Sequence, residues 1–146
     1  MNETVTELIR HTEILHELDV FDARRGVLEA ALALGFARDE AHFLVTALTE
    51  LANNIVFHSL GGSIAVERVG RHAHDPCSAE TGIRLVASDR GPGIEDVALA
   101  LQDGFSTGGS LGCGLSGVGR LMDELDVVSS PGGTRITATL WRRGPL

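Results

Sequence analysis

The sequence contains no lysine. All twelve of its basic residues are arginines, and they are set against twenty aspartates and glutamates, for a formal net charge of -8. A Walker A loop needs its lysine, the usual protein-kinase domain needs the lysine of its third strand, and Schiff-base chemistry needs an amine, so these classes are excluded. The acidic balance also argues against a nucleic-acid partner, because sequence-independent binders neutralise phosphates with clustered basic residues.

Cysteines and long apolar runs are also scarce. Cys77 and Cys113 make no spaced disulfide framework, and the first residues lack the basic and then apolar pattern of a signal peptide. No uninterrupted apolar run approaches the roughly 18 residues that would span a bilayer. We therefore expect a reduced, soluble, cytoplasmic protein without a membrane partner, formed by one domain over residues 1–146.

Glycine, by contrast, is in excess, and the excess is local. Eleven of the 18 glycines fall between Gly91 and Gly133. Within this region, residues 104–119 carry no formal charge and lead into an expected helix. Backbone N–H groups in such a loop, together with a helix N-terminus, form an anion cradle that needs no lysine and fits a polyphosphate.

Hydrophobic periodicity predicts two helices early in the chain. The clearer one has apolar residues at spacings of three and four from Ala41 to Val56, with Asp39 as its expected N-cap. Before it, a helix over 20–34 is expected to be capped by Asp19 and stopped by Gly35. The other expected elements are a short strand over 14–18, strands over 63–69 and 82–89 joined by a polar loop, a short helix over 97–102, a helix over 115–125, and a hairpin of 127–129 with 134–141.

This order of elements favours an α/β (α+β) two-layer sandwich with a mixed, mostly antiparallel sheet and the helices on one face. Since aromatic residues make up only 4% of the chain, Leu, Val, Ile and Ala must fill the core.

Two groups of polar residues have the types and spacing that chemistry requires. Glu50 and Asn54 are four apart on the expected helix and therefore project from one face, where a carboxylate and an amide oxygen can serve Mg²⁺ and activate a hydroxyl. Asp89 directly follows an apolar strand, where its carboxylate can accept from an exocyclic amino group. Gly91 and Gly93 would let the backbone turn close to a flat ligand.

Taken together and in order, four segments resemble the ATP-binding boxes of the GHKL superfamily, which includes gyrase, histidine kinases and anti-sigma-factor kinases. These segments are Glu50-x-x-x-Asn54, Asp89-x-Gly91-x-Gly93, the loop 108–114 and Gly132-Gly133-Thr134. The resemblance implies a Bergerat-type ATP-binding fold. Within the superfamily, the segments 103–107, 112–115 and 117–124 are similar to those of the RsbT-type switch kinases of bacterial stress signalling.

The resemblance implies a role for each matching residue. Glu50 would be the general base toward a protein hydroxyl, Asn54 the Mg²⁺ ligand, and Asp89 the acceptor for the adenine amino group. The other residues that it implies for ATP binding shape the adenine pocket or the phosphate lid: Gly91, Gly93, Ser106, Thr107, Gly108, Gly109, Gly112, Gly114, Leu115 and Thr134.

The resemblance also implies partners. RsbT-type kinases use ATP and Mg²⁺ to phosphorylate Ser or Thr residues of STAS-domain scaffold proteins and, once released, activate a phosphatase of the PP2C type. Ser116 and Gly119 depart from the pattern, because such kinases often carry Pro and Lys there, and the lid is less charged as a result. Two alternatives stay open: a nucleotide-binding partner-switch module that sequesters a regulator without phosphorylating it, and an anti-sigma factor.

Overall fold

A computed structural model of the chain describes residues 4–72, 79–91 and 114–143, and the predicted helix over 97–102 lies outside them. The described elements, in chain order, are β1 (Thr4–Ile14), α1 (Glu17–Ala33), α2 (Arg38–His58), β2 (Gly62–His72), β3 (Ala79–Asp89), α4 (Gly114–Leu121), β4 (Glu124–Ser130) and β5 (Gly133–Trp141).

The strands form one sheet in the order β1-β2-β3-β5-β4, and each of its described pairs is antiparallel. β3 and β5 are neighbours, although α4 and β4 separate them in sequence. Their register sets Asp89 opposite Thr134 at one end and Gly82 opposite Trp141 at the other. Residues far apart in the chain therefore meet where β3 ends and β5 begins.

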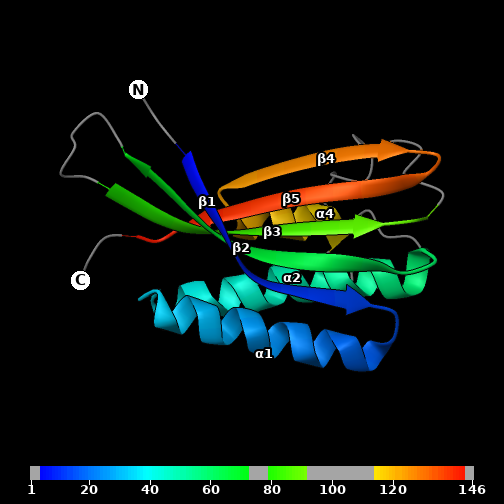
Figure 1. The fold of residues 1–146 in the computed structure, drawn as a ribbon, viewed down its shortest axis with the longest axis horizontal. Helices are drawn as coiled ribbons and strands as arrows, with labels where there is room; N and C mark the ends of the chain where they lie inside the picture. The colour runs from blue at the N-terminus through cyan, green and yellow to red at the C-terminus, as the bar shows by residue number, and fades with distance from the viewer. Residues whose placement is uncertain (1–3, 73–78, 92–113, 144–146) are drawn as a thin grey trace.

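The helices cover one face of this sheet, with α1 and α2 side by side and α4 beyond the upper strands in the view of Figure 1. The apolar stripe predicted for α2 is its buried face, since Leu44, Leu48 and Leu51 are at most 1% exposed. Alternate residues of β3, namely Ile83, Leu85 and Ala87, meet it from the sheet. The predicted two-layer sandwich is confirmed. None of the described helices has both the length and the apolarity of a membrane span.

Both α1 and α2 begin before the aspartates that were predicted to cap them. α1 begins at Glu17, and the carboxylate of Asp19, inside its first turn, accepts from the backbone N–H groups of Leu15 (2.8 Å) and His16 (2.9 Å). The predicted strand over 14–18 is therefore wrong, because these bonds turn the chain into a helix directly after β1. The N-cap of α1 is therefore His16 and not the predicted Asp19, and the N-cap of α2 is Ala37 and not the predicted Asp39. The predicted helix stop at Gly35 is confirmed by its φ of 81°.

The strands are longer than the sequence predicted. β2 and β3 extend to His72 and from Ala79, so both ends of the predicted polar loop, residues 70–72 and 79–81, are paired sheet. The predicted helix over 115–125 ends at Leu121, because Asp123 then turns the chain toward β5 through its backbone N–H to the carbonyl of Thr139 (2.9 Å). β4 follows from Glu124.

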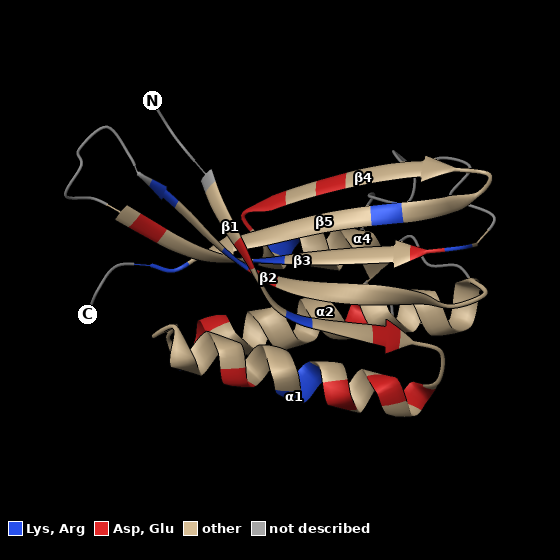
Figure 2. Ribbon diagram, viewed as in Figure 1, with Lys and Arg blue, Asp and Glu red and all other residues tan. Residues whose placement is uncertain are grey.

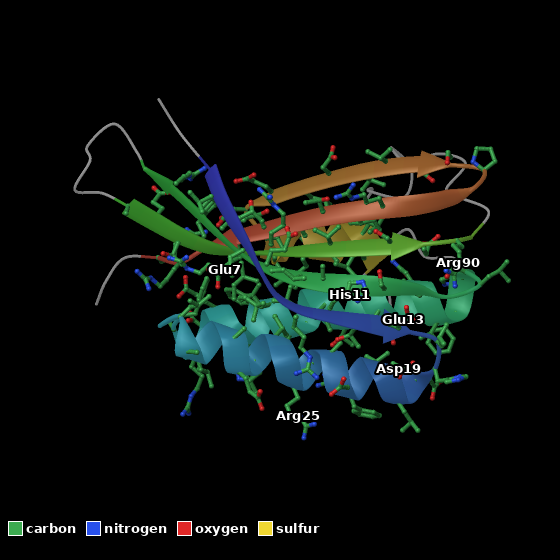
Figure 3. All side chains as sticks on the ribbon, viewed as in Figure 1. Glu7, His11, Glu13, Asp19, Arg25 and Arg90 are labelled. Carbon is green, nitrogen blue, oxygen red and sulfur yellow. The ribbon has the colours of Figure 1, made fainter. Side chains whose placement is uncertain are left out.

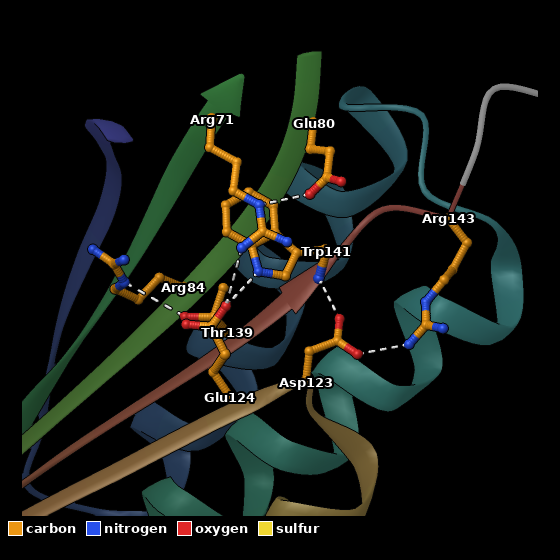
Figure 4. A network of polar contacts seen from close by, with 8 residues as sticks. All are labelled: Arg71, Glu80, Arg84, Asp123, Glu124, Thr139, Trp141 and Arg143. Atoms are coloured by element: carbon orange, nitrogen blue, oxygen red, sulfur yellow. Dashed lines mark hydrogen bonds and ion pairs between the residues drawn. The ribbon is translucent and has the colours of Figure 1, made fainter. Parts of the chain in front are cut away.

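A network of polar contacts fastens the sheet at the end away from Asp89 (Figure 4). The Arg71 guanidinium lies 4.0 Å from the centroid of the Trp141 ring and bonds Glu80 (2.6 Å). The Trp141 indole N–H donates to Glu124 (2.5 Å), and its backbone N–H donates to Asp123 (2.8 Å). These contacts join β2, β3, β4 and β5.

Glu40 joins the start of α2 to the end of the chain. Its side chain is 5% exposed, and its two oxygens accept from the backbone N–H groups of Ala37 and Arg143, each at 2.8 Å. We expect Glu40→Ala to lower the free energy of unfolding by about 1–3 kcal/mol, since both donors lose a charged partner. Urea denaturation measures it. The exposed Glu29→Ala is the matched control, and equal stabilities of the two variants would contradict the role given to Glu40.

Candidate functional site

One oxygen of Asp89 organises the end of β3. Asp89 Oδ1 accepts from the backbone N–H of Gly91 (2.8 Å) and from that of Thr134 on β5 (3.2 Å). Thr134 is 6% exposed, and its hydroxyl lies 2.9 Å from that of Ser129 on β4. Both of these hydrogen bonds go to Oδ1, and among the described residues none goes to Oδ2.

The backbone around this carboxylate is packed so closely that side chains are excluded. A Cβ on Gly133 would lie 2.2 Å from the carbonyl oxygen of Asp89. One on Gly91 would lie 2.9 Å from Cβ of Ser59, the residue that caps α2 and whose hydroxyl donates to the carbonyl of Ile55 (2.7 Å). Through Ser59, the end of β3 lies against the C-terminal turns of α2.

Glu50 and Asn54 lie on those turns. Both side chains are half-buried, and the backbone N–H of Gly114, the first residue of α4, donates to the Glu50 carboxylate. Glu50 therefore lies where α4 begins, which is also where the glycine-rich segment enters the described structure. Helix periodicity explains the arrangement, since residues four apart share a face and this face lies beside the buried stripe.

Burial raises the pKa of the Glu50 carboxyl above its ordinary value of 4.5, and the hydrogen bond from Gly114 opposes that rise without cancelling it. A carboxylate with a raised pKa holds a proton more strongly and is a better general base. Glu50 and Asn54 could supply only some of the ligands that a metal ion needs. Mg²⁺ usually takes one or two protein oxygens together with waters and substrate phosphates, and the oxygens of Asn54 and Glu50 fit that pattern. Within the described residues, no group of three or more His, Cys, Asp or Glu could hold a metal alone.

The remaining predicted site residues divide into two groups. Leu115 is 4% exposed and belongs to the hydrophobic core, so its side chain packs and does not line a surface. The others lie outside the described residues: Gly93, Ser106, Thr107, Gly108, Gly109 and Gly112. Ser116 and Gly119, which depart from the kinase pattern, lie on α4, with Ser116 buried and Gly119 exposed.

Sequence reasoning missed two residues that hold the site in place. Ser59 caps α2 against Gly91, and Ser129 meets the hydroxyl of Thr134. A serine after a long amphipathic helix and before Gly61-Gly62 is a usable signal for the first. The second depends on the register of β4 with β5, which pairs Ser129 with Thr134.

Residues 16–140 match the histidine kinase-like ATPase domain, and the chain therefore belongs to this family of ATP-binding domains. The chain is 40% identical over 131 residues to the serine/threonine-protein kinase RsbT of Bacillus subtilis, covering 89% of this chain and 94% of the relative. The predicted resemblance to RsbT-type kinases is thereby confirmed, as is the prediction of a protein serine/threonine kinase.

A second relative is named as an anti-sigma factor. The chain is 31% identical over 121 residues to the anti-sigma F factor of Caldanaerobacter subterraneus, covering 80% of this chain and 81% of the relative.

Solved structures share the fold at low identity. The RsbU and RsbW domains of Rv1364c from Mycobacterium tuberculosis match with a TM-score of 0.60 and 18% identity, over 99% of this chain and 34% of that one. The mycobacterial sensor histidine kinase MprB matches with a TM-score of 0.52 and 20% identity, over 99% of this chain and 100% of that one. At these identities the likeness shows the fold alone.

Two adjacent glycines test the close packing around Asp89. We expect Gly133→Ala to destabilise the protein by about 1–3 kcal/mol, because its methyl group would overlap the Asp89 carbonyl and shift Thr134. Gly132→Ala is the matched control, since a Cβ there meets nothing within 4 Å. Thermal unfolding and ATP titration measure both variants. Indistinguishable results for the two would show that the packing is not tight.

Proposed function

We propose that this chain transfers the γ-phosphoryl group of ATP to a Ser or Thr hydroxyl of a STAS-domain regulatory protein. The observation that carries the proposal is the position of Glu50 and Asn54, half-buried on one face of α2, with the Glu50 carboxylate accepting from the first residue of α4. The relationship to RsbT supports a kinase. The geometry supports Glu50 and Asn54 as the residues at the site of phosphoryl transfer.

Glu50 is proposed as the general base. It would accept the proton of the attacking hydroxyl while the new oxygen–phosphorus bond forms and the bond between the γ-phosphorus and the bridging oxygen breaks, with ADP as the leaving group. The raised pKa of its carboxyl suits this task, because proton transfer is most effective when the pKa of the base approaches the working pH.

Asp89 and Thr134 are proposed to hold the adenine. Asp89 Oδ1 is occupied by two backbone donors, which fixes the carboxylate and leaves Oδ2 for the exocyclic amino group. The Thr134 hydroxyl, positioned by Ser129, would lie beside it. When bound, Mg²⁺ would neutralise phosphate charge, with Asn54 as its proposed protein ligand. The phosphate lid is proposed for Ser106, Thr107, Gly108, Gly109, Gly112 and Gly114, with Gly93 beside the nucleotide.

The proposed setting is a cytoplasmic partner switch. After release from its STAS-domain partner, the kinase would activate a PP2C-type phosphatase. A second candidate function, an anti-sigma factor, is favoured by the relationship to the anti-sigma F factor. Incubation with radiolabelled ATP and the STAS protein tests the proposal directly. Label on a Ser or Thr of that protein supports it, whereas capture of a sigma factor with no label on any STAS protein would favour the second candidate.

Glu50→Gln separates chemistry from binding. We expect it to leave ATP affinity nearly unchanged and to lower phosphoryl transfer by roughly 10²–10⁴-fold, the usual contribution of a general base. Single-turnover transfer and nucleotide titration measure the two effects. Glu29→Gln on the exposed face of α1 is the control, and full activity of Glu50→Gln would remove Glu50 from the mechanism.

The same variant tests the pKa of Glu50 through stability. Because the folded-state pKa is raised, the stability that this group contributes is fully present below about pH 4.5 and is lost as the pH rises through the folded-state value. Glu50→Gln does not titrate, so its melting temperature should gain on that of the wild type between about pH 4 and pH 7. A difference that stays constant across this range would contradict the raised pKa.

Asp89→Asn tests the adenine assignment. The amide NH₂ would face the adenine amino group as a second donor, and we expect ATP affinity to fall by about 1.5–3 kcal/mol, or roughly 10- to 150-fold. Calorimetric titration measures it, with Asp126→Asn on the exposed edge of β4 as the matched control. Unchanged ATP binding by Asp89→Asn would overturn the assignment.

A further inference from the structure

α1 has two apolar faces, and only one of them is covered. The inner face, with Val20, Ala23 and Val27 at most 6% exposed, packs on the core. The outer stripe consists of Leu18, Phe21, Arg25, Leu28 and Leu32, and its four apolar members are 76%, 61%, 38% and 54% exposed in that order.

The outer stripe faces away from the rest of the described structure. In Figure 3, α1 is the outermost helix, and Arg25 extends from it on the side opposite the sheet. The Arg25 side chain is 72% exposed. Four large exposed apolar side chains aligned on one helix face are more than the single apolar residues that scatter over an ordinary surface, and such alignment marks an interaction site.

The spacing of the stripe indicates the shape of its partner. Its members follow one another at three, four, three and four residues, the interval of the a and d positions in a coiled coil. They extend over two heptads, or about 21 Å of helix. A surface with this periodicity fits the apolar side of another helix.

Charge beside the stripe indicates the chemistry of that helix. Asp22 and Glu29, seven residues apart, flank it on the side toward β1, where Asp22 pairs with Arg10 (2.7 Å) and with Arg25 of the stripe itself (3.7 Å). The other flank carries the exposed Glu17 and Arg24, whose charges are opposite. Figure 2 shows acidic residues on both sides of a central basic position along α1. A complementary helix has basic residues along this flank and an acidic residue opposite Arg25.

The same charges disfavour two other occupants. A second copy that aligned the two stripes would set Arg25 against Arg25, and in the antiparallel orientation Asp22 would meet Glu29 of the other copy. An anionic membrane surface would be repelled by the acidic flank and by the net charge of -8.

We propose that the outer stripe of α1 docks an amphipathic helix of a partner protein, one that carries a basic flank and an acidic residue within its apolar seam. The contact is separate from the ATP site and does not depend on phosphoryl transfer. A two-heptad contact is short, so the complex would be reversible, which suits a regulator that exchanges partners.

Two synthetic helices of about three heptads test the proposal with the full chain. Both have Leu at the a and d positions apart from one central a position. The first has Lys at e and g and Glu at that position; the second has Glu at e and g and Lys at that position. Fluorescence anisotropy measures their binding, amide hydrogen exchange locates it, and ATP titration confirms that each variant keeps its nucleotide site.

We expect the basic helix to bind at least about 10-fold more tightly than the acidic one and to protect amides of α1. Phe21→Ser should weaken binding about 10-fold or more, whereas Phe57→Ser, with a side chain 60% exposed on α2, should not. The double variant Arg25→Glu with Glu29→Lys should reverse the preference between the two helices.

Equal binding of the two helices, or equal binding by Phe21→Ser and the wild type, would overturn the proposal. So would a stable dimer in sedimentation analysis that Phe21→Ser disperses, because the stripe would then be covered by a second copy. Flotation with vesicles of anionic phospholipid that depends on Phe21 would assign the stripe to a membrane surface instead. In each case, unchanged ATP affinity keeps this result distinct from any failure of the proposed kinase site.

Discussion

The hydrogen bonds of Asp89 Oδ1 hold together the end of the sheet on which the candidate site depends. Two backbone donors from segments more than forty residues apart share this one oxygen. β5 also passes the Asp89 carbonyl closely, because a Cβ on Gly133 would lie only 2.2 Å from that carbonyl oxygen. A carboxylate anchored by one oxygen keeps its other oxygen fixed in space. Recognition of a flat, amino-bearing ring requires such fixed placement, because a freely rotating carboxylate would lose side-chain entropy on binding.

α2 serves the fold and the site with different faces of one helix. Its buried stripe places the helix on the sheet to within the tolerance of core packing, which admits few voids. Because Glu50 and Asn54 lie beside the stripe on the same helix, the packing of the stripe also fixes their positions. The half-burial that raises the pKa of Glu50 follows from the same packing, so a property useful in catalysis costs the fold some stability at neutral pH.

Much of this arrangement could be predicted from local sequence. The stripe from Ala41 to Val56, the stop at Gly35 and the hairpin around Gly132 all depend on residues within a few positions of one another, and each is present. The spacing of Glu50 and Asn54 is also local, so their common face could be derived. What the sequence alone could not yield depends on distant partners: the pairing of β1 with β2, the end of α4 at Leu121, and the packing of Gly91 against Ser59. β1 was missed because its residues are mostly exposed on both sides of an edge strand, which leaves no alternation to detect.

The N-terminus of α4 supplies positive potential near Glu50 in a chain that has no lysine. Gly114 directs a backbone N–H at Glu50 from the first turn of α4, and a helix N-terminus carries partial positive charge without any basic side chain. α1 and α2 both depart from simple amphipathicity, and each does so at a surface to which we assign a function. α2 half-buries polar groups, and α1 exposes apolar groups. Each departure costs free energy in the isolated chain, through the desolvation of a carboxylate in one case and the hydration of Leu and Phe in the other. A bound ligand or partner can recover that cost, and this is why such conflicts between pattern and burial point to function more reliably than composition does.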